Sequence, residues 1–116
     1  MRRVGVFGGS FDPVHTGHLF VAQAALERAG LDEVLFVPAA RPPHKLDMIL
    51  SPGADRLAML EAALRGKPEF GVEAMELARE GPSYTVDTVR ALLERLGAAE
   101  EVELFLIIGG DIVRIN

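Results

Sequence analysis

The sequence predicts an α/β protein built on an open parallel sheet with helices on both faces. Short apolar runs alternate along the chain with longer segments of helical periodicity, the order that gives parallel strands joined by right-handed crossovers. The longest apolar run lies in residues 102–108, as expected for a strand covered on both faces. No repeat or linker interrupts the 116 residues, so we expect a single domain over residues 1–116.

Four segments are predicted as strands from their length, apolar content and flanking residues. They are residues 4–7, 33–37, 70–74 and 102–108. The third alternates between apolar and polar residues, so we expect it to be shorter and more exposed. With four strands and three helices, the last strand would lack its cover on one side. Its exposed apolar edge would favour association with another chain, so a homo-oligomer is one expectation.

Three helices are predicted from apolar spacing and from their end signals. The first covers residues 18–29 and ends at Gly30, which suits a C-terminal cap. The second begins at Ser51 as N-cap and Pro52 as first helical residue and ends near residue 66. The third follows the turn at residues 81–82 and stops at residue 97. Arg56 lies on the second helix, and we expect it to face solvent.

Composition limits the compartment and the partners. The formal net charge of −5 makes nucleic acid a poor partner. The chain has no cysteine, which excludes disulfides and thiolate metal sites and fits a reducing compartment. The apolar run after Arg2 and Arg3 is too short for a signal peptide, and no run approaches the ~20 residues that span a bilayer. We therefore expect a cytoplasmic protein that binds neither nucleic acid nor membrane.

The stretch GGSFDPVHTGH, residues 8–18, directly follows the first predicted strand. Gly8 and Gly9 expose backbone N–H groups beside a helix start, which favours binding of a phosphate. His15 and His18 stand at positions i and i+3 and would point roughly the same way. Two imidazoles there could stabilise charge that grows on a phosphoryl group during transfer. The spacing matches neither the dinucleotide fingerprint nor the Walker loop.

The same residues could instead serve the fold alone. The glycine turn could be connection geometry, and a histidine near a helix start could be a cap. A zinc site with Asp12 or His44 as additional ligands is a third possibility. We disfavour it because no full ligand set has clear spacing, and we predict no metal site formed by the protein alone.

Ligands of parallel α/β sheets bind beyond the carboxyl ends of the strands. This rule places residues 8–18, 38–45 and 109–111 along one edge. Lys45 is one of only two lysines and lies in one of these segments, although a solvated surface charge accounts for it equally well. Asp111 follows a buried strand, a place where loops often carry function.

GGSFDPVHTGHL, residues 8–19, resembles the nucleotidyltransferase superfamily, whose signature is H-x-G-H after a glycine-rich turn. PAARPPHK, GPSYTVDT and FLIIGGD occur in the order found in bacterial nicotinate-nucleotide adenylyltransferase, and the similarity runs over residues 4–111. The resemblance implies a Rossmann-like fold. It also implies that ATP and nicotinate mononucleotide give nicotinate adenine dinucleotide and pyrophosphate, a step towards NAD.

The same resemblance implies a set of site residues. His15 and His18 would be catalytic and contact the ATP phosphates, with His18 on the α-phosphate in the transition state. The remaining ATP-binding residues would be Gly8, Gly9, Ser10, Phe11, Gly109 and Asp111. Nicotinate mononucleotide would be bound by His44, Lys45, Ser83, Tyr84 and Thr85, although Tyr84 could equally pack in the core. Mg²⁺ would accompany the triphosphate.

The family pattern continues beyond Asp111 with a tryptophan-bearing segment, another strand and a Ser/Thr-x-x-Arg motif. This chain ends in IVRIN and has no tryptophan, so the resemblance predicts that the C-terminal part of the fold is missing. One alternative function is therefore a catalytically incompetent nucleotide-binding fragment. Another is a phosphopantetheine-type adenylyltransferase, which the PPHK and PSYT stretches disfavour.

Overall fold

The computed structural model describes residues 1–40, 49–79, 85–98, 100–109 and 111–115. The strands are β1 (Arg2–Gly9), β2 (Glu33–Pro38), β3 (Phe70–Val72), β4 (Val102–Ile108) and β5 (Asp111–Arg114). The helices are α1 (Thr16–Ala29), α2 (Gly53–Leu64), the short 3₁₀ helix η2 (Met75–Ala78) and α3 (Thr85–Gly97). In this described part, no helix is both long and apolar enough to cross a bilayer.

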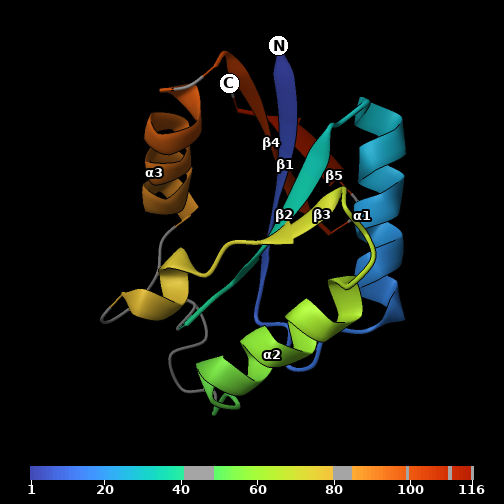
Figure 1. Ribbon diagram of the computed structural model, residues 1–116, viewed down its shortest axis with the longest axis vertical. Helices are drawn as coiled ribbons and strands as arrows, with labels where there is room; N and C mark the ends of the chain where they lie inside the picture. The colour runs from blue at the N-terminus through green and yellow to red at the C-terminus, as the bar shows by residue number, and fades with distance from the viewer. Residues whose placement is uncertain (41–48, 80–84, 99, 110, 116) are drawn as a thin grey trace.

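The five strands form one sheet in the order β3-β2-β1-β4-β5 (Figure 1). β1 lies in the middle and pairs in parallel with β2 and β4, and β2 pairs in parallel with β3. The α/β fold and the four parallel strands are confirmed. β5 was not predicted: it runs antiparallel to β4 and takes the edge that we expected β4 to expose. Four residues after a glycine turn gave too short a pattern to indicate a strand.

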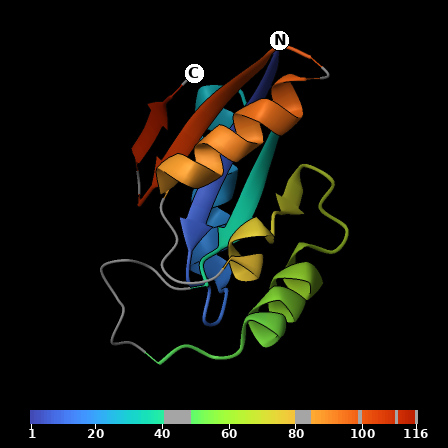
Figure 2. The same cartoon turned by 90° about the vertical axis from the view of Figure 1, so that its left-hand side faces the viewer.

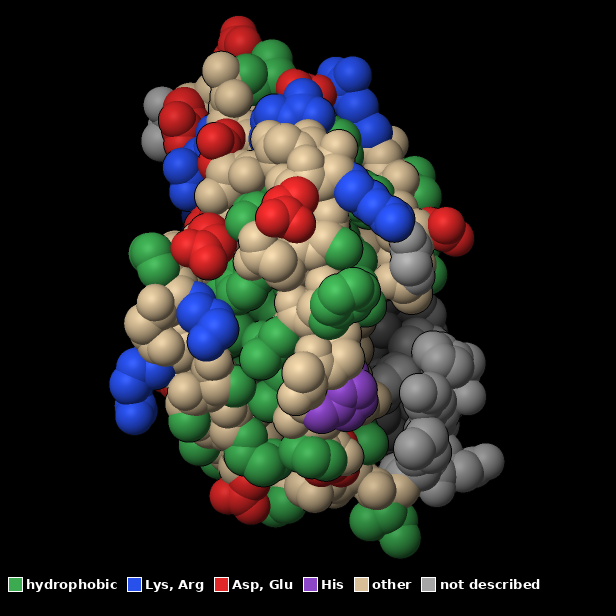
Figure 3. All heavy atoms as spheres, turned by 90° about the vertical axis from the view of Figure 1, so that its right-hand side faces the viewer, with side chains coloured by type: hydrophobic (Ala, Val, Ile, Leu, Met, Phe, Trp, Pro, Cys, Tyr) green, Lys and Arg blue, Asp and Glu red, His purple; other side chains and the backbone are tan. Residues whose placement is uncertain are grey.

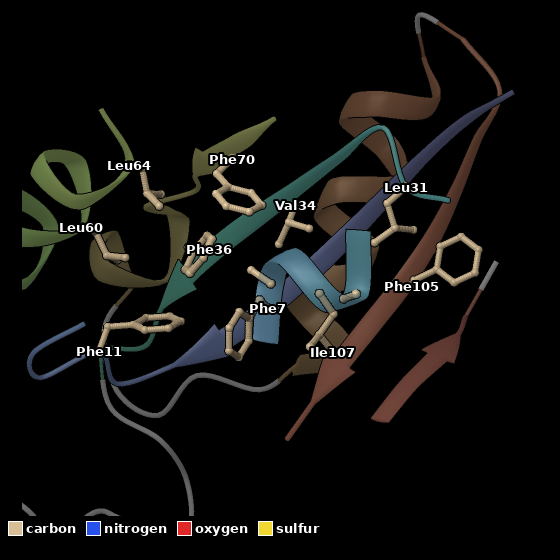
Figure 4. Packing of buried hydrophobic residues seen from close by; sticks show 12 residues of the cluster. Phe7, Phe11, Leu31, Val34, Phe36, Leu60, Leu64, Phe70, Phe105 and Ile107 are labelled. Carbon is tan, nitrogen blue, oxygen red and sulfur yellow. The ribbon is translucent and has the colours of Figure 1, made fainter. Parts of the chain in front are cut away.

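Helices cover both faces of the sheet, as predicted (Figure 1). On one face, α1 and α2 pack over a cluster that contains most of the phenylalanines (Figure 4). On the other face, α3 and η2 pack over a second, aliphatic cluster, in which Leu92 and Leu104 are fully buried. The sheet is therefore a central layer whose two faces are both apolar.

The end signals of the helices were right for α1 and wrong for α2. Gly30 caps α1 in the left-handed conformation, with φ of 60°, and its N–H donates to the carbonyl of Leu26. In α2, Pro52 takes the N-cap position and no side chain caps the helix. The N–H of Ser51 instead donates to the carboxylate of Asp12 at 2.8 Å. Ser51 therefore takes part in a long-range contact and does not provide the local cap that the sequence indicated.

The parallel strands point their carboxyl ends to one edge of the sheet, and both α1 and α3 begin there (Figures 1 and 2). α1 follows β1 along the chain, and α3 precedes β4. Helix starts leave backbone N–H groups without intrahelical partners. The fold therefore gathers hydrogen-bond donors at this edge.

Candidate functional site

The carboxyl edge brings the starts of the three predicted ligand segments together. Gly9 pairs with Pro38 across β1 and β2, and the N–H of Ala39 donates to the carbonyl of Gly9 at 2.9 Å. Gly109 follows β4, the neighbour of β1 on its other side. Gly8 and Gly9 are the last two residues of β1. Their backbone is therefore part of the carboxyl end of this strand and not of a free loop.

His15 and His18 both cap the start of α1. The Nδ1 atom of His15 accepts a hydrogen bond from the N–H of Gly17 at 3.1 Å. The Nδ1 atom of His18 accepts one from the N–H of His15 at 3.0 Å. The two rings stack with their centroids 3.8 Å apart and their planes at 26°. The expectation of a histidine cap is therefore right, and the cap uses only one nitrogen of each ring.

These two hydrogen bonds select one tautomer of each neutral ring. An Nδ1 atom that accepts a backbone N–H cannot carry a proton, so the proton of the neutral imidazole lies on Nε2. Among the described residues, neither Nε2 has a hydrogen-bond partner. Histidine is visible on the surface in Figure 3; His15 is exposed and His18 is half-buried. The arrangement therefore leaves two N–H donors side by side for a ligand.

The ring of His18 packs against two phenylalanine rings of the core. Its ring centroid lies 4.9 Å from that of Phe11 and 6.1 Å from that of Phe7. Burial lowers the pKa of His18 below its ordinary value of 6.5, and the charge of His15 lowers it further. Desolvation and a neighbouring cation both disfavour the imidazolium. His18 is therefore a neutral donor at neutral pH.

This lowered pKa predicts how the stability of the fold depends on pH. The folded chain binds fewer protons at His18 than the unfolded chain, so acid favours unfolding. The contribution of His18 to the free energy of unfolding should be complete above pH ~6.5 and should fall as the pH drops through the lower pKa of the folded state. NMR titration of the His18 ring should give a midpoint below 6.5. The pH dependence of urea unfolding should flatten in His18→Asn, and an unchanged dependence would contradict the assignment.

Phe11 is buried, and its ring packs against the ring of His18. The resemblance implies that Phe11 lines the nucleotide site, and in the structure 2% of the residue is exposed. Its ring contacts Phe7 and Phe36 in the core as well as His18 (Figure 4). A Cβ on Gly9 would lie 3.3 Å from the Phe11 ring. The absence of a side chain at Gly9 therefore leaves room for the ring that supports His18.

Arg56 was predicted to face solvent, and this prediction was wrong: only 2% of the residue is exposed. Its Nη1 donates to the carbonyls of Ser10 at 2.9 Å and Ala39 at 2.7 Å. Its Nε donates to the carbonyl of Ser51 at 2.9 Å. A signal for this burial was present in the sequence. Arg56 precedes Leu60 by four residues and therefore lies on the buried stripe of α2.

Ser10 and Asp12 occupy the turn between β1 and α1. The Oγ of Ser10 is buried and has no hydrogen-bond partner among the described residues. Asp12 is exposed, and its carboxylate accepts the hydrogen bond from Ser51. This backbone hydrogen bond is the largest cause that lowers the pKa of Asp12. The turn is therefore tied to the chain that leads into α2.

Only some of the remaining predicted site residues fall within the described structure. Thr85 is exposed and begins α3, and Gly109 is exposed with φ of 58°. Asp111 is exposed and pairs with Ile108 in the turn from β4 to β5. The other predicted substrate contacts lie outside the described residues: His44, Lys45, Ser83 and Tyr84. Within the described ranges, no group of three or more potential metal ligands is found.

Gly17 offers a test of the histidine pair that spares the fold. A Cβ at Gly17 would lie 3.0 Å from Cε1 and 3.1 Å from Nδ1 of His15, so Gly17→Ala should push the ring aside by a few tenths of an ångström. Alanine is the better helix former by ~1 kcal/mol, so the melting temperature should not fall. The resemblance implies ATP as the ligand, and we expect its affinity to fall roughly threefold to tenfold because the donor is displaced.

Calorimetric titration with ATP and thermal unfolding measure the two effects of Gly17→Ala separately. Gly97→Ala is the matched control, because it also places alanine in a helix and its Cβ would contact nothing within 4 Å. An ATP affinity for Gly17→Ala equal to that of the control would contradict the placement of His15.

Comparisons with known proteins agree with this geometry. The family model described as cytidylyltransferase-like matches residues 6–115. The chain is 47% identical, over 94% of its length, to a protein of Dehalococcoides mccartyi named "Probable nicotinate-nucleotide adenylyltransferase". It is 45% identical, over 97% of its length, to the Bacillus subtilis protein named "Nicotinate-nucleotide adenylyltransferase". It covers 52% and 58% of these two proteins, so it spans little more than half the length of these curated relatives.

A solved structure supports the fold. The Plasmodium falciparum nicotinic acid mononucleotide adenylyltransferase complexed with NaAD superposes with a TM-score of 0.74 at 17% identity. The superposition covers 91% of this chain and 51% of the Plasmodium chain. The Rossmann-like arrangement expected from the resemblance is therefore confirmed. Since the family model spans nearly all of the sequence, the chain belongs to the cytidylyltransferase-like family.

Proposed function

We propose that the protein transfers an adenylyl group from ATP to nicotinate mononucleotide and so takes part in NAD biosynthesis. The proposal rests on the two imidazoles that cap the start of α1, beyond the carboxyl end of β1. Their Nε2–H groups have no hydrogen-bond partner among the described residues. The relatives at 45–50% identity bear the name of this activity. We also propose that it acts in the cytoplasm.

The chemistry requires little beyond alignment and charge stabilisation. A phosphate oxygen of the mononucleotide attacks the α-phosphorus of ATP in line, and a new P–O bond forms. The bond between the α-phosphorus and the bridging oxygen breaks, and pyrophosphate leaves with that electron pair. The Nε2–H groups of His15 and His18 donate to phosphoryl oxygens as negative charge moves onto them. Mg²⁺ enters as part of the MgATP substrate.

The remaining site residues belong to the proposal as well. Ser10 would offer its unpartnered Oγ to the nucleotide, and Phe11 would act by supporting His18. Gly8, Gly9, Gly109 and Asp111 would lie around the same nucleotide at the edge of the sheet. His44, Lys45, Ser83, Tyr84 and Thr85 would bind nicotinate mononucleotide, with the start of α3 facing its anionic groups.

Release of pyrophosphate tests the proposal and separates it from its alternatives. The protein should be incubated with MgATP and nicotinate mononucleotide. Release of pyrophosphate supports the enzyme. Binding of ATP without release would favour the nucleotide-binding module.

Competition decides the acceptor. Phosphopantetheine should not compete with nicotinate mononucleotide in this assay. Release that depends on phosphopantetheine instead would transfer the proposal to that class of adenylyltransferase.

A further inference from the structure

Arg56 is a buried cation that no carboxylate neutralises within the described residues. Arginine is rarely buried to this degree unless it is paired. Here the guanidinium donates to three main-chain carbonyls and not to a carboxylate. They are the carbonyls of Ser10, Ala39 and Ser51. Three neutral carbonyl groups therefore surround the guanidinium charge at the edge where the phosphates would bind.

The three carbonyls come from three different segments of the edge. Ser10 follows β1, Ala39 follows β2, and Ser51 precedes α2. Such a rigid fork of donors suits contacts at fixed angles to several acceptors. Residues 10, 39 and 51 are far apart in sequence, and hydrogen bonds from the one guanidinium of Arg56 join them. The hydrogen bond from Ser51 to Asp12 adds a second tie to the same turn.

We propose that Arg56 is a positioning residue of the nucleotide site. Its guanidinium fixes the backbone of Ser10 against the chain after β2, and thereby sets the turn that leads to the histidine pair. Its charge adds to the attraction for a polyphosphate. The inference rests on the proposed function, since it takes ATP as the ligand of this corner. Nothing in the H-x-G-H stretch itself indicates this residue, because it lies on α2.

Two substitutions at Arg56 separate positioning from general stability. Arg56→Lys keeps the charge but replaces the planar fork with a compact ammonium that cannot satisfy the three carbonyls in the same geometry. Arg56→Met removes both charge and donors. Arg65→Met is the matched control, because it removes the same charge from an exposed position at the end of α2.

The experiment measures kcat, the KM for ATP and the melting temperature of the protein and its variants. For Arg56→Lys we expect kcat/KM for ATP to fall about 10- to 100-fold, as for a misplacement of up to ~1 Å. Most of the loss should lie in KM, because the turn contacts the nucleotide before and during reaction. Arg56→Met should lose more, and Arg65→Met should match the wild type.

Calorimetric titration with MgATP keeps the inference separate from the proposed activity. A wild-type protein that binds ATP but releases no pyrophosphate would contradict the activity, while weaker ATP binding by Arg56→Lys would still support the positioning role. If Arg56→Lys melts at a lower temperature yet binds ATP with wild-type affinity, Arg56 is merely structural. Failure of both Arg56 variants to fold would also overturn the inference.

Discussion

His18→Asn is expected to lower the turnover of the proposed reaction by ~10²–10⁴ while the chain still folds. That range is typical for loss of one positioned hydrogen-bond donor or general acid, and it corresponds to roughly 3–5 kcal/mol of transition-state stabilisation. Asparagine is chosen because its side-chain oxygen can replace Nδ1 as the acceptor of the His15 N–H. It has no group in the place of Nε2. The substitution therefore keeps the cap and removes the proposed donor.

His18→Ala supplies the comparison, because it loses both cap and donor. Its free energy of unfolding should fall by ~1 kcal/mol through loss of the cap, whereas that of His18→Asn should change less. Turnover by pyrophosphate release and stability by urea unfolding measure the two effects. Near-normal turnover in His18→Asn would show that the imidazole serves only as a cap.

The fold could be predicted from the sequence where a pattern was local and repeated. The alternation of apolar runs with helical segments predicted four parallel strands and helices on both faces, and Gly30 marked the end of α1 correctly. The misses involved contacts that depend on distant residues. β5 forms only because β4 offers it an edge. The helix α2 begins one residue later than predicted, and the N–H of Ser51 donates to the distant Asp12.

In the candidate site, too, local patterns could be predicted and contacts between distant residues could not. His15 and His18 could be identified because a glycine turn, a helix start and two imidazoles lie within eleven residues. Their stacking and their choice of nitrogen could not, since both follow from the backbone at the start of α1. The burial of Arg56 could have been predicted from its spacing to Leu60 on α2. Its three acceptors could not, because they are main-chain carbonyl groups, which every residue carries.

Phe11→Ala is expected to lower the free energy of unfolding by about 3–5 kcal/mol, the usual loss for a buried phenylalanine. The ring is almost fully buried and lies 5.4 Å from Phe7 and 5.5 Å from Phe36, centroid to centroid. The residue also holds φ at 46°, in the left-handed region. Alanine would keep that unfavourable conformation without the packing that offsets it. Urea unfolding measures the loss, which is a large part of the roughly 5–15 kcal/mol typical of a domain.

Phe70→Ala distinguishes loss of packing from loss of support for the site. Phe70 is also buried and contacts Phe36 at 5.7 Å, but no described contact joins it to His18. Both variants should be destabilised to a similar degree. Only Phe11→Ala should raise the pKa of His18 toward 6.5, because burial is the main cause of its lowering. If both variants shift the His18 titration equally, or neither does, the ring of Phe11 is core packing and does not set the chemistry of the histidine.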